Sequence, residues 1–122
     1  MVQKLTETEE EIMQQIWKLG DCTVRQIMEA MDAEDRPHST VSSVVRILEK
    51  KGYVDHKAYG RTHVYYPIVA QEGYVQQNLE EMEEDYFSGS TKNLVSFLVE
   101  KEKLSPEDLE EMMALINKSS KS

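Results

Sequence analysis

One segment, residues 38–51, constrains the fold more than any other, because it predicts a helix with two chemically different faces. Its aliphatic residues recur at intervals of three and four, as they do in a helix that packs against a core. These residues are Val41, Val44, Val45 and Leu48. At about 100° per residue, the opposite face carries Ser39, Ser43, Arg46 and Lys50, with Ser42 beside them. Small side chains let a helix backbone approach DNA, and arginine binds guanine edges or phosphates, so this face suits the major groove.

The residue pattern changes after Gly52, where helical spacing gives way to aromatic and β-branched residues. Two such runs, 53–57 and 62–66, flank the turn sequence Ala58-Tyr59-Gly60-Arg61. This arrangement predicts a β-hairpin whose second strand is closed by Pro67. Lys57 and Arg61 are expected near the tip of the hairpin, where they would contact DNA phosphates.

The predicted helix and hairpin together define the expected DNA contacts. These residues are Ser39, Thr40, Ser42, Ser43, Arg46, Lys50, Lys57 and Arg61. Ile47 interrupts the polar face of the helix. It either packs on a neighbouring element or touches a thymine methyl group, and the pattern does not choose between these two roles.

Two short helices are expected ahead of this segment, because two capping boxes are present. Thr6 with Glu9 opens the first helix, which ends at Gly20, and Thr23 with Gln26 opens the second. The polar stretch 32–37 predicts a loop. Three short helices followed by a basic hairpin make a winged helix-turn-helix domain, in which the hairpin is the wing. We assign this DNA-binding domain to residues 1–70.

Residues 71–122 predict a helical dimerisation arm. The stretch 71–86 is strongly acidic and carries a narrow apolar stripe like a coiled-coil seam, and two shorter amphipathic helices follow it. Such narrow stripes bury little surface alone, so we expect them to pair with a second copy of the chain. A monomer in which the arm caps the wing domain is the alternative. The expected interface residues are Val75, Leu79, Met82, Tyr86, Leu94, Phe97, Leu98, Leu109, Met112 and Ile116. The fold class is therefore mostly α with a small β-hairpin.

The charge distribution supports DNA binding although the whole chain carries a net charge of −9. Residues 36–66 hold six basic and two acidic residues, a local charge of +4, and all three histidines. The remainder of the chain has 8 basic and 21 acidic residues. A local reversal of sign is what phosphate contacts require, although a chance cluster on a solvated surface would look the same.

Other function classes receive little support. The carboxylates lie in runs typical of solvated helix faces, and the sequence has no nucleophile elbow, phosphate-binding glycine loop or zinc-protease helix motif. The single Cys22 allows neither an internal disulfide nor a multi-cysteine zinc site. We therefore expect no enzyme activity, no cofactor and no metal. Without a signal peptide or a long apolar run, a cytoplasmic protein that does not insert into membranes is expected.

Along most of its length the chain resembles the penicillinase-repressor family of antibiotic-responsive transcriptional repressors, the BlaI/MecI type. Each matching piece is weak alone, and the combination is specific. The matching residues are Leu5-Thr6, Glu9 through Trp17, Ser39-Thr40-Val41, Leu48-Glu49-Lys50-Lys51-Gly52-Tyr53-Val54, Asp55-His56-Lys57 through Tyr65-Tyr66-Pro67, Leu94-Val95 through Glu100-Lys101, and Leu104-Ser105.

The resemblance implies a homodimer that represses genes from palindromic operators in double-stranded DNA. It also implies control by a membrane-bound zinc-protease sensor, whose signal leads to cleavage of the arm in the segment that aligns with Phe97 and Leu98. The alternative for these two residues is a purely structural place in the dimer interface. The alternative for the whole chain is a winged-helix module that binds proteins and shows no salt-dependent DNA binding.

Overall fold

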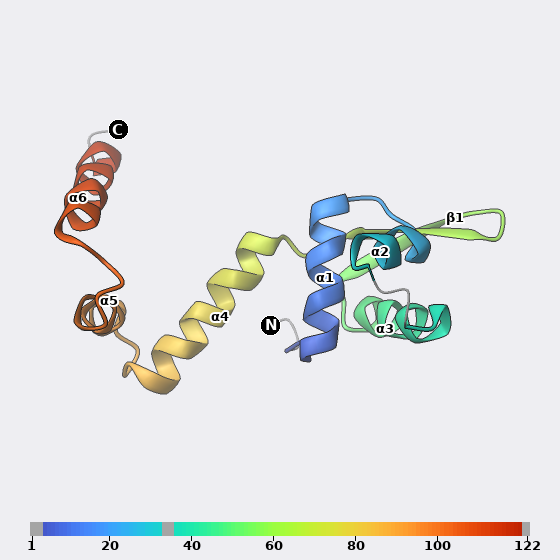
Figure 1. Cartoon of the computed structure of the whole chain (residues 1–122), viewed down its shortest axis with the longest axis horizontal. Helices are drawn as coiled ribbons and strands as arrows, with labels where there is room; N and C mark the ends of the chain where they lie inside the picture. The colour runs from blue at the N-terminus through green and yellow to red at the C-terminus, as the bar shows by residue number, and fades with distance from the viewer. Residues whose placement is uncertain (1–3, 33–35, 121–122) are drawn as a thin grey trace. The chain divides into compact units, whose positions relative to one another are not determined.

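The computed structural model describes residues 4–32 and 36–120, so the middle of the loop expected at 32–37 lies outside the described residues. The described part contains α1 (Glu7–Leu19), α2 (Val24–Ala30) and α3 (His38–Lys50). Strands β1 (Val54–Tyr59) and β2 (Thr62–Pro67) follow, and then α4 (Gln71–Tyr86), α5 (Thr91–Glu100) and α6 (Pro106–Ser120). The predicted fold class, mostly helical with one hairpin, is confirmed. In Figure 1 the hairpin extends away from the three N-terminal helices.

Side-chain caps start the first two helices as the sequence predicted. At α1, the Thr6 hydroxyl accepts from the backbone N–H of Glu9, and the Glu9 carboxylate accepts from the backbone N–H of Thr6. Thr23 and Gln26 make the same reciprocal pair at α2. Each box satisfies N–H groups that a helix start otherwise leaves without a partner, and so fixes where the helix begins.

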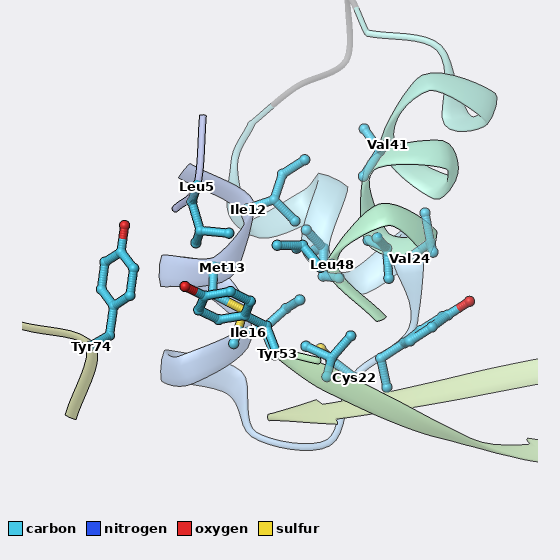
Figure 2. Close-up of a cluster of buried hydrophobic side chains, with 14 residues drawn as sticks. Leu5, Ile12, Met13, Ile16, Cys22, Val24, Val41, Leu48, Tyr53 and Tyr74 are labelled. Carbon is cyan, nitrogen blue, oxygen red and sulfur yellow. The ribbon is translucent and has the colours of Figure 1, made fainter. Parts of the chain in front are cut away.

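A hydrophobic core joins α1, α2, α3 and the base of the hairpin. Figure 2 shows Ile12 and Met13 of α1 gathered with Leu48 of α3, beside Tyr53. From α3, Val41, Val45 and Leu48 are at most 1% exposed, while Val44 is half-buried at the margin of the core. Each fully buried valine or leucine stabilises the fold by roughly 1.5–3 kcal/mol. The aliphatic face of α3 therefore fixes the orientation of its other face.

The base of the wing is tied to the turn between α1 and α2. Cys22 and Tyr65 exchange two backbone hydrogen bonds, of 2.8 and 2.7 Å, as an isolated antiparallel bridge. Both side chains are buried. Burial, with a contribution from the Asp21 carboxylate, raises the pKa of the Cys22 thiol to about 11. Cys22 is thus a protonated core residue that helps to set the position of the hairpin.

The chain divides into two compact units after Val75, inside α4 and beyond the boundary at residue 70 expected from the sequence. The reason lies in Tyr74, which is buried against the first unit (Figure 2). Its ring packs against Trp17 and Tyr53, and its hydroxyl donates a 2.8 Å hydrogen bond to Glu10. Trp17 also donates to the Val69 carbonyl at 2.8 Å. The first turn of α4 therefore packs with the winged-helix unit.

The second unit contains the rest of α4 together with α5 and α6. Ser90 caps α5 by accepting from the backbone N–H of Asn93, and Ser105 caps α6 in a reciprocal pair with Asp108. Phe87 and Phe97 pack edge to face with their ring centroids 5.5 Å apart. Among the described residues, no helix combines the length and the apolarity that crossing a membrane requires.

Candidate nucleic-acid interface

The outer face of α3 presents to solvent the side chains that the sequence predicted for DNA contact. Ser39, Thr40, Ser43, Arg46 and Lys50 are exposed, and Ser42 is half-buried. The Ser43 hydroxyl donates a 2.8 Å hydrogen bond to the Ser39 carbonyl. Because this bond uses the hydroxyl proton, the Ser43 oxygen can still accept a hydrogen bond from a ligand.

Arg46 lies against its own helix without a strong partner there. Its Nε atom is 3.5 Å from the Ser42 carbonyl, a long and weak hydrogen bond. Ile47 is 42% exposed and lines a shallow hollow with Ser43, Arg46, Glu49 and Lys50. Ile47 is thus not a core residue of this chain, and its side chain is available to a ligand of α3.

Two of the six basic residues in the local charge excess are engaged elsewhere. Arg36 bonds Glu11 of α1 at 3.1 Å. Lys51 bonds Glu9 at 2.6 Å and the Lys4 carbonyl at 3.2 Å. The local charge therefore overstates the cations available to DNA, because these two pairs act within the fold. The remaining four are Arg46, Lys50, Lys57 and Arg61.

The hairpin is longer and its loop tighter than the sequence indicated. The strands pair from Val54 with Pro67 to Tyr59 with Thr62, which leaves only Gly60 and Arg61 in the loop. Gly60 has φ +63°, a conformation that favours glycine. Arg61 is therefore at the tip, whereas Lys57 lies within β1. Both are exposed, and the Lys57 ammonium lies 5.7 Å from the centre of the Tyr66 ring.

A group of side chains between α3 and the wing was not assigned from the sequence. His56 Nδ1 lies 2.7 Å from a Glu49 oxygen, and the His56 ring stacks on His63 with centroids 4.5 Å apart. Burial raises the pKa of the neighbouring Tyr65, the Glu49 charge adds to this, and Arg46 opposes it. The clustering of all three histidines in one basic segment was the only sequence signal, and it did not reveal the pairing with Glu49.

Among the described residues, one group has the spacing of metal ligands: Glu49, Asp55 and His56. One possible ligand atom from each lies within 4.8 Å of the others. The hydrogen bond between His56 and Glu49 accounts for part of this closeness. The Asp55 carboxylate accepts at 2.8 Å from the backbone N–H of His56, which accounts for the rest. We therefore assign no metal to this group.

Most residues expected at the dimer interface are exposed in the described part of the chain. Those at least one-third exposed are Val75, Leu79, Met82, Tyr86, Phe97, Met112 and Ile116. Leu94, Leu98 and Leu109 are half-buried. So many solvent-facing apolar side chains on three helices are unusual for the surface of a monomeric protein. They are typical of a surface that a partner covers.

Comparison with known proteins identifies the family. The sequence profile of the penicillinase repressor family matches residues 5–118, which is nearly the whole chain. The chain belongs to the penicillinase repressor family. It is accordingly a DNA-binding transcriptional repressor, and that family is not a class of enzymes.

Relatives of this repressor include a methicillin resistance regulatory protein and a penicillinase repressor. It is 27% identical to the methicillin resistance regulatory protein MecI of Staphylococcus aureus (strain N315) over 116 residues, which cover 94% of each chain. It is 22% identical to the penicillinase repressor of Bacillus licheniformis over 116 residues, covering 94% and 91% of the two chains. The resemblance seen in the sequence is therefore confirmed.

Solved structures of BlaI share the fold of this repressor's N-terminal unit. The solution structure of the BlaI DNA-binding domain has a TM-score of 0.53 and 24% identity, covering 61% of this chain and 92% of that one. The Bacillus licheniformis BlaI monomer in complex with the blaP half-operator has a TM-score of 0.50 and 25% identity, with the same coverage. These matches confirm the predicted winged helix.

Proposed function

We propose that this repressor binds a palindromic operator as a homodimer, with α3 of each copy in the major groove and each wing on the adjacent backbone. Two copies related by a two-fold axis match the two halves of a palindrome. The arm formed by α4, α5 and α6 would join the copies. Repression follows when the dimer occupies the operator.

The separation of the two faces of α3 is the observation that carries this proposal. Val41, Val45 and Leu48 hold the helix against the core, so the exposed Ser43 and Arg46 face away from the domain on a rigid support. The fixed helix backbone determines which side chains can reach a bound duplex, and an exposed arginine can read guanine through two parallel hydrogen bonds. The BlaI monomer bound to a half-operator supports one such domain per half-site.

Operator binding is tested by fluorescence anisotropy with the full chain and a DNA fragment from its own promoter region. Arg46→Ala should cost roughly 1–3 kcal/mol of affinity and relax the preference for operator over random DNA if Arg46 reads a base. The control is Lys18→Ala, which removes an exposed cation on α1 and should leave both quantities unchanged. Equal loss for all DNA sequences would make Arg46 a phosphate contact only.

Salt dependence separates DNA binding from protein docking. A dimer that neutralises several phosphates should show a log–log slope of affinity against salt of roughly −4 to −8. Lys57→Ala and Arg61→Ala should each flatten this slope and weaken binding to all sequences alike. Absence of any salt-dependent binding by the wild-type chain would refute the proposal.

Relief of repression by proteolysis in the arm is the regulatory part of the proposal, and the family resemblance supports it. Phe97 and Leu98 lie within α5, and Phe97 is 38% exposed. Proteases cut segments that have transiently unfolded. A cut between Phe97 and Leu98 therefore requires α5 to unfold locally. Mass spectrometry of the repressor from cells that carry a membrane zinc-protease sensor should show fragments divided between Phe97 and Leu98 after induction. Intact repressor in induced cells would refute this regulation and leave operator binding untouched.

A further inference from the structure

A hollow between α2, α3 and the wing collects basic side chains that the sequence analysis did not assign together. Arg25 comes from α2, His38 from the start of α3, Arg61 from the hairpin loop and His63 from β2. None of the described residues that line this hollow carries a carboxylate. Two arginines and two histidines without an acid among them form a surface that attracts an anion.

Hydroxyl groups complete the lining of the hollow. Thr23, Ser42 and Thr62 contribute side chains to it, and Tyr65, which is 3% exposed, closes one side. Hydroxyl and guanidinium groups are among the side-chain donors that proteins use on DNA phosphates. The hollow therefore offers both the charge and the hydrogen-bond donors that a phosphodiester needs.

Within residues 4–32 and 36–120, the basic side chains of the hollow form no strong pair with a carboxylate. Arg25 Nε lies 3.6 Å from Glu29 on the same helix, and the two side chains are 86% and 70% exposed. Such exposed pairs contribute little free energy, so Arg25 can turn to a stronger partner at small cost. His63 stacks on His56, which holds its ring in place at the rim while leaving it exposed.

We propose that a phosphodiester of the operator backbone occupies this hollow, held by Arg25 and Arg61 with His38 and His63. Ser42 and Arg61 are common to the hollow and to the expected DNA contacts, so the hollow continues the DNA-facing surface. The inference rests on the proposed function and names a contact within it. Backbone contacts of this kind set the register of a DNA reader, so α2 and the wing together would position α3 on its half-site.

A scan with singly substituted methylphosphonate operators tests the proposal, because each substitution removes the charge of one phosphate. The wild-type repressor should lose about tenfold in affinity at one phosphate per half-site, as expected for a charge-assisted hydrogen bond. Arg25→Ala should lose a similar factor on unmodified DNA, and its further loss at that same methylphosphonate should be smaller than the wild-type loss because one partner of the phosphate is already gone. Arg25→Lys should recover part of the loss, since the charge returns without the planar guanidinium.

The salt slope gives an independent readout that a structural role for Arg25 would not move. Arg25→Ala should flatten the slope by about 0.9 per lost contact, hence by about 1.8 for a dimer, and weaken specific and random DNA equally. Lys18→Ala is the matched control and should change neither quantity. The inference is overturned if Arg25→Ala and the pair His38→Gln with His63→Gln behave like Lys18→Ala.

Two further outcomes distinguish the failure of this contact from the failure of operator binding as a whole. If Arg46→Ala relaxes operator preference while the Arg25 variant binds normally, the proposed function stands and the hollow does not hold a phosphate of DNA. Titration of inorganic phosphate, followed by the imidazole NMR signals of His38 and His63, identifies a site for small anions. Saturable binding of free phosphate without an effect of Arg25→Ala on DNA affinity would assign the hollow to a small anion and overturn the proposal.

Discussion

Glu9 shows how much one residue contributes to the fold. Its carboxylate closes the capping box of α1 at 3.0 Å from the Thr6 nitrogen and also bonds the Lys51 ammonium at 2.6 Å. Burial alone would raise the pKa of Glu9, but the hydrogen bonds from Lys51 and Thr6, with the Lys51 charge, outweigh it and lower the pKa. The folded state therefore favours ionised Glu9 more than the unfolded chain does.

The stabilisation of the fold by Glu9 should therefore decrease as the pH is lowered. It is fully present above the ordinary glutamate pKa and is lost as the pH falls through that value toward the lowered one. At pH 7, Glu9→Gln should reduce the free energy of unfolding by about 1–3 kcal/mol, while glutamine can still complete the capping box.

Urea unfolding at pH 7 and at about pH 3 measures the difference between wild type and Glu9→Gln. The difference should shrink at the lower pH. Glu7→Gln, at an exposed position in the same turn, is the control and should show a much smaller difference at both pH values. A difference for Glu9→Gln that does not change with pH would contradict a stabilising charge.

At the scale of the element, one face of α3 packs in the core and the opposite face carries the residues proposed to contact DNA. The 3.6-residue period separates the two sets of side chains, so a change on one side need not disturb the other. Val45 is fully buried and Ile47, two residues on, is 42% exposed. These two residues allow the roles to be measured separately.

Val45→Ala should destabilise the domain by roughly 1–3 kcal/mol, because it removes buried methyl groups and leaves a cavity. Ile47→Ala should change stability by less than about 0.5 kcal/mol. If Ile47 touches a thymine methyl, Ile47→Ala should weaken operator binding and reduce discrimination at that base pair alone. Thermal unfolding and binding to operators with thymine replaced by uracil provide the two measurements. A large loss of stability in Ile47→Ala would show that Ile47 packs within the chain.

At the scale of the whole molecule, two compact units have different surfaces. The first unit has a closed core that extends to Tyr74. The described part of the second unit leaves many apolar side chains in solvent, among them Leu79 at 41% and Ile116 at 59% exposure. Burying such side chains against a second copy would remove their apolar surface from water and so stabilise a dimer.

Leu79→Asp should therefore convert a dimer to a monomer and weaken operator binding, because each half-site would then be bound independently. The winged-helix unit should stay folded, since Leu79 lies outside its core. Gln76→Asp adds the same charge at an exposed polar position of α4 and should leave the dimer intact. Sedimentation equilibrium and anisotropy give the two readouts, and an unchanged dimer for Leu79→Asp would refute the assignment of α4 to the interface.

The amino-acid sequence alone determined the local architecture of this repressor. Both capping boxes, the two faces of α3 and the hairpin depend on residues a few positions apart, whose interactions follow from helix and strand geometry. Many short matching segments, taken together, also indicated the family. The exposed side chains on α3 could also be predicted from helix geometry. Once Val41 and Val45 are buried, the residues on the opposite face must point outward.

Only the tertiary structure decided which basic residues are paired within the fold and where the first unit ends. Arg36 pairs with a residue 25 positions away and Lys51 with one 42 positions away, and Tyr74 reaches Glu10 across 64 positions. The hollow of Arg25, His38, Arg61 and His63 likewise draws on α2, α3 and the wing. Periodicity cannot reveal such pairs, because they form only when packing of the core brings distant segments together, and the packing depends on all of the elements at once.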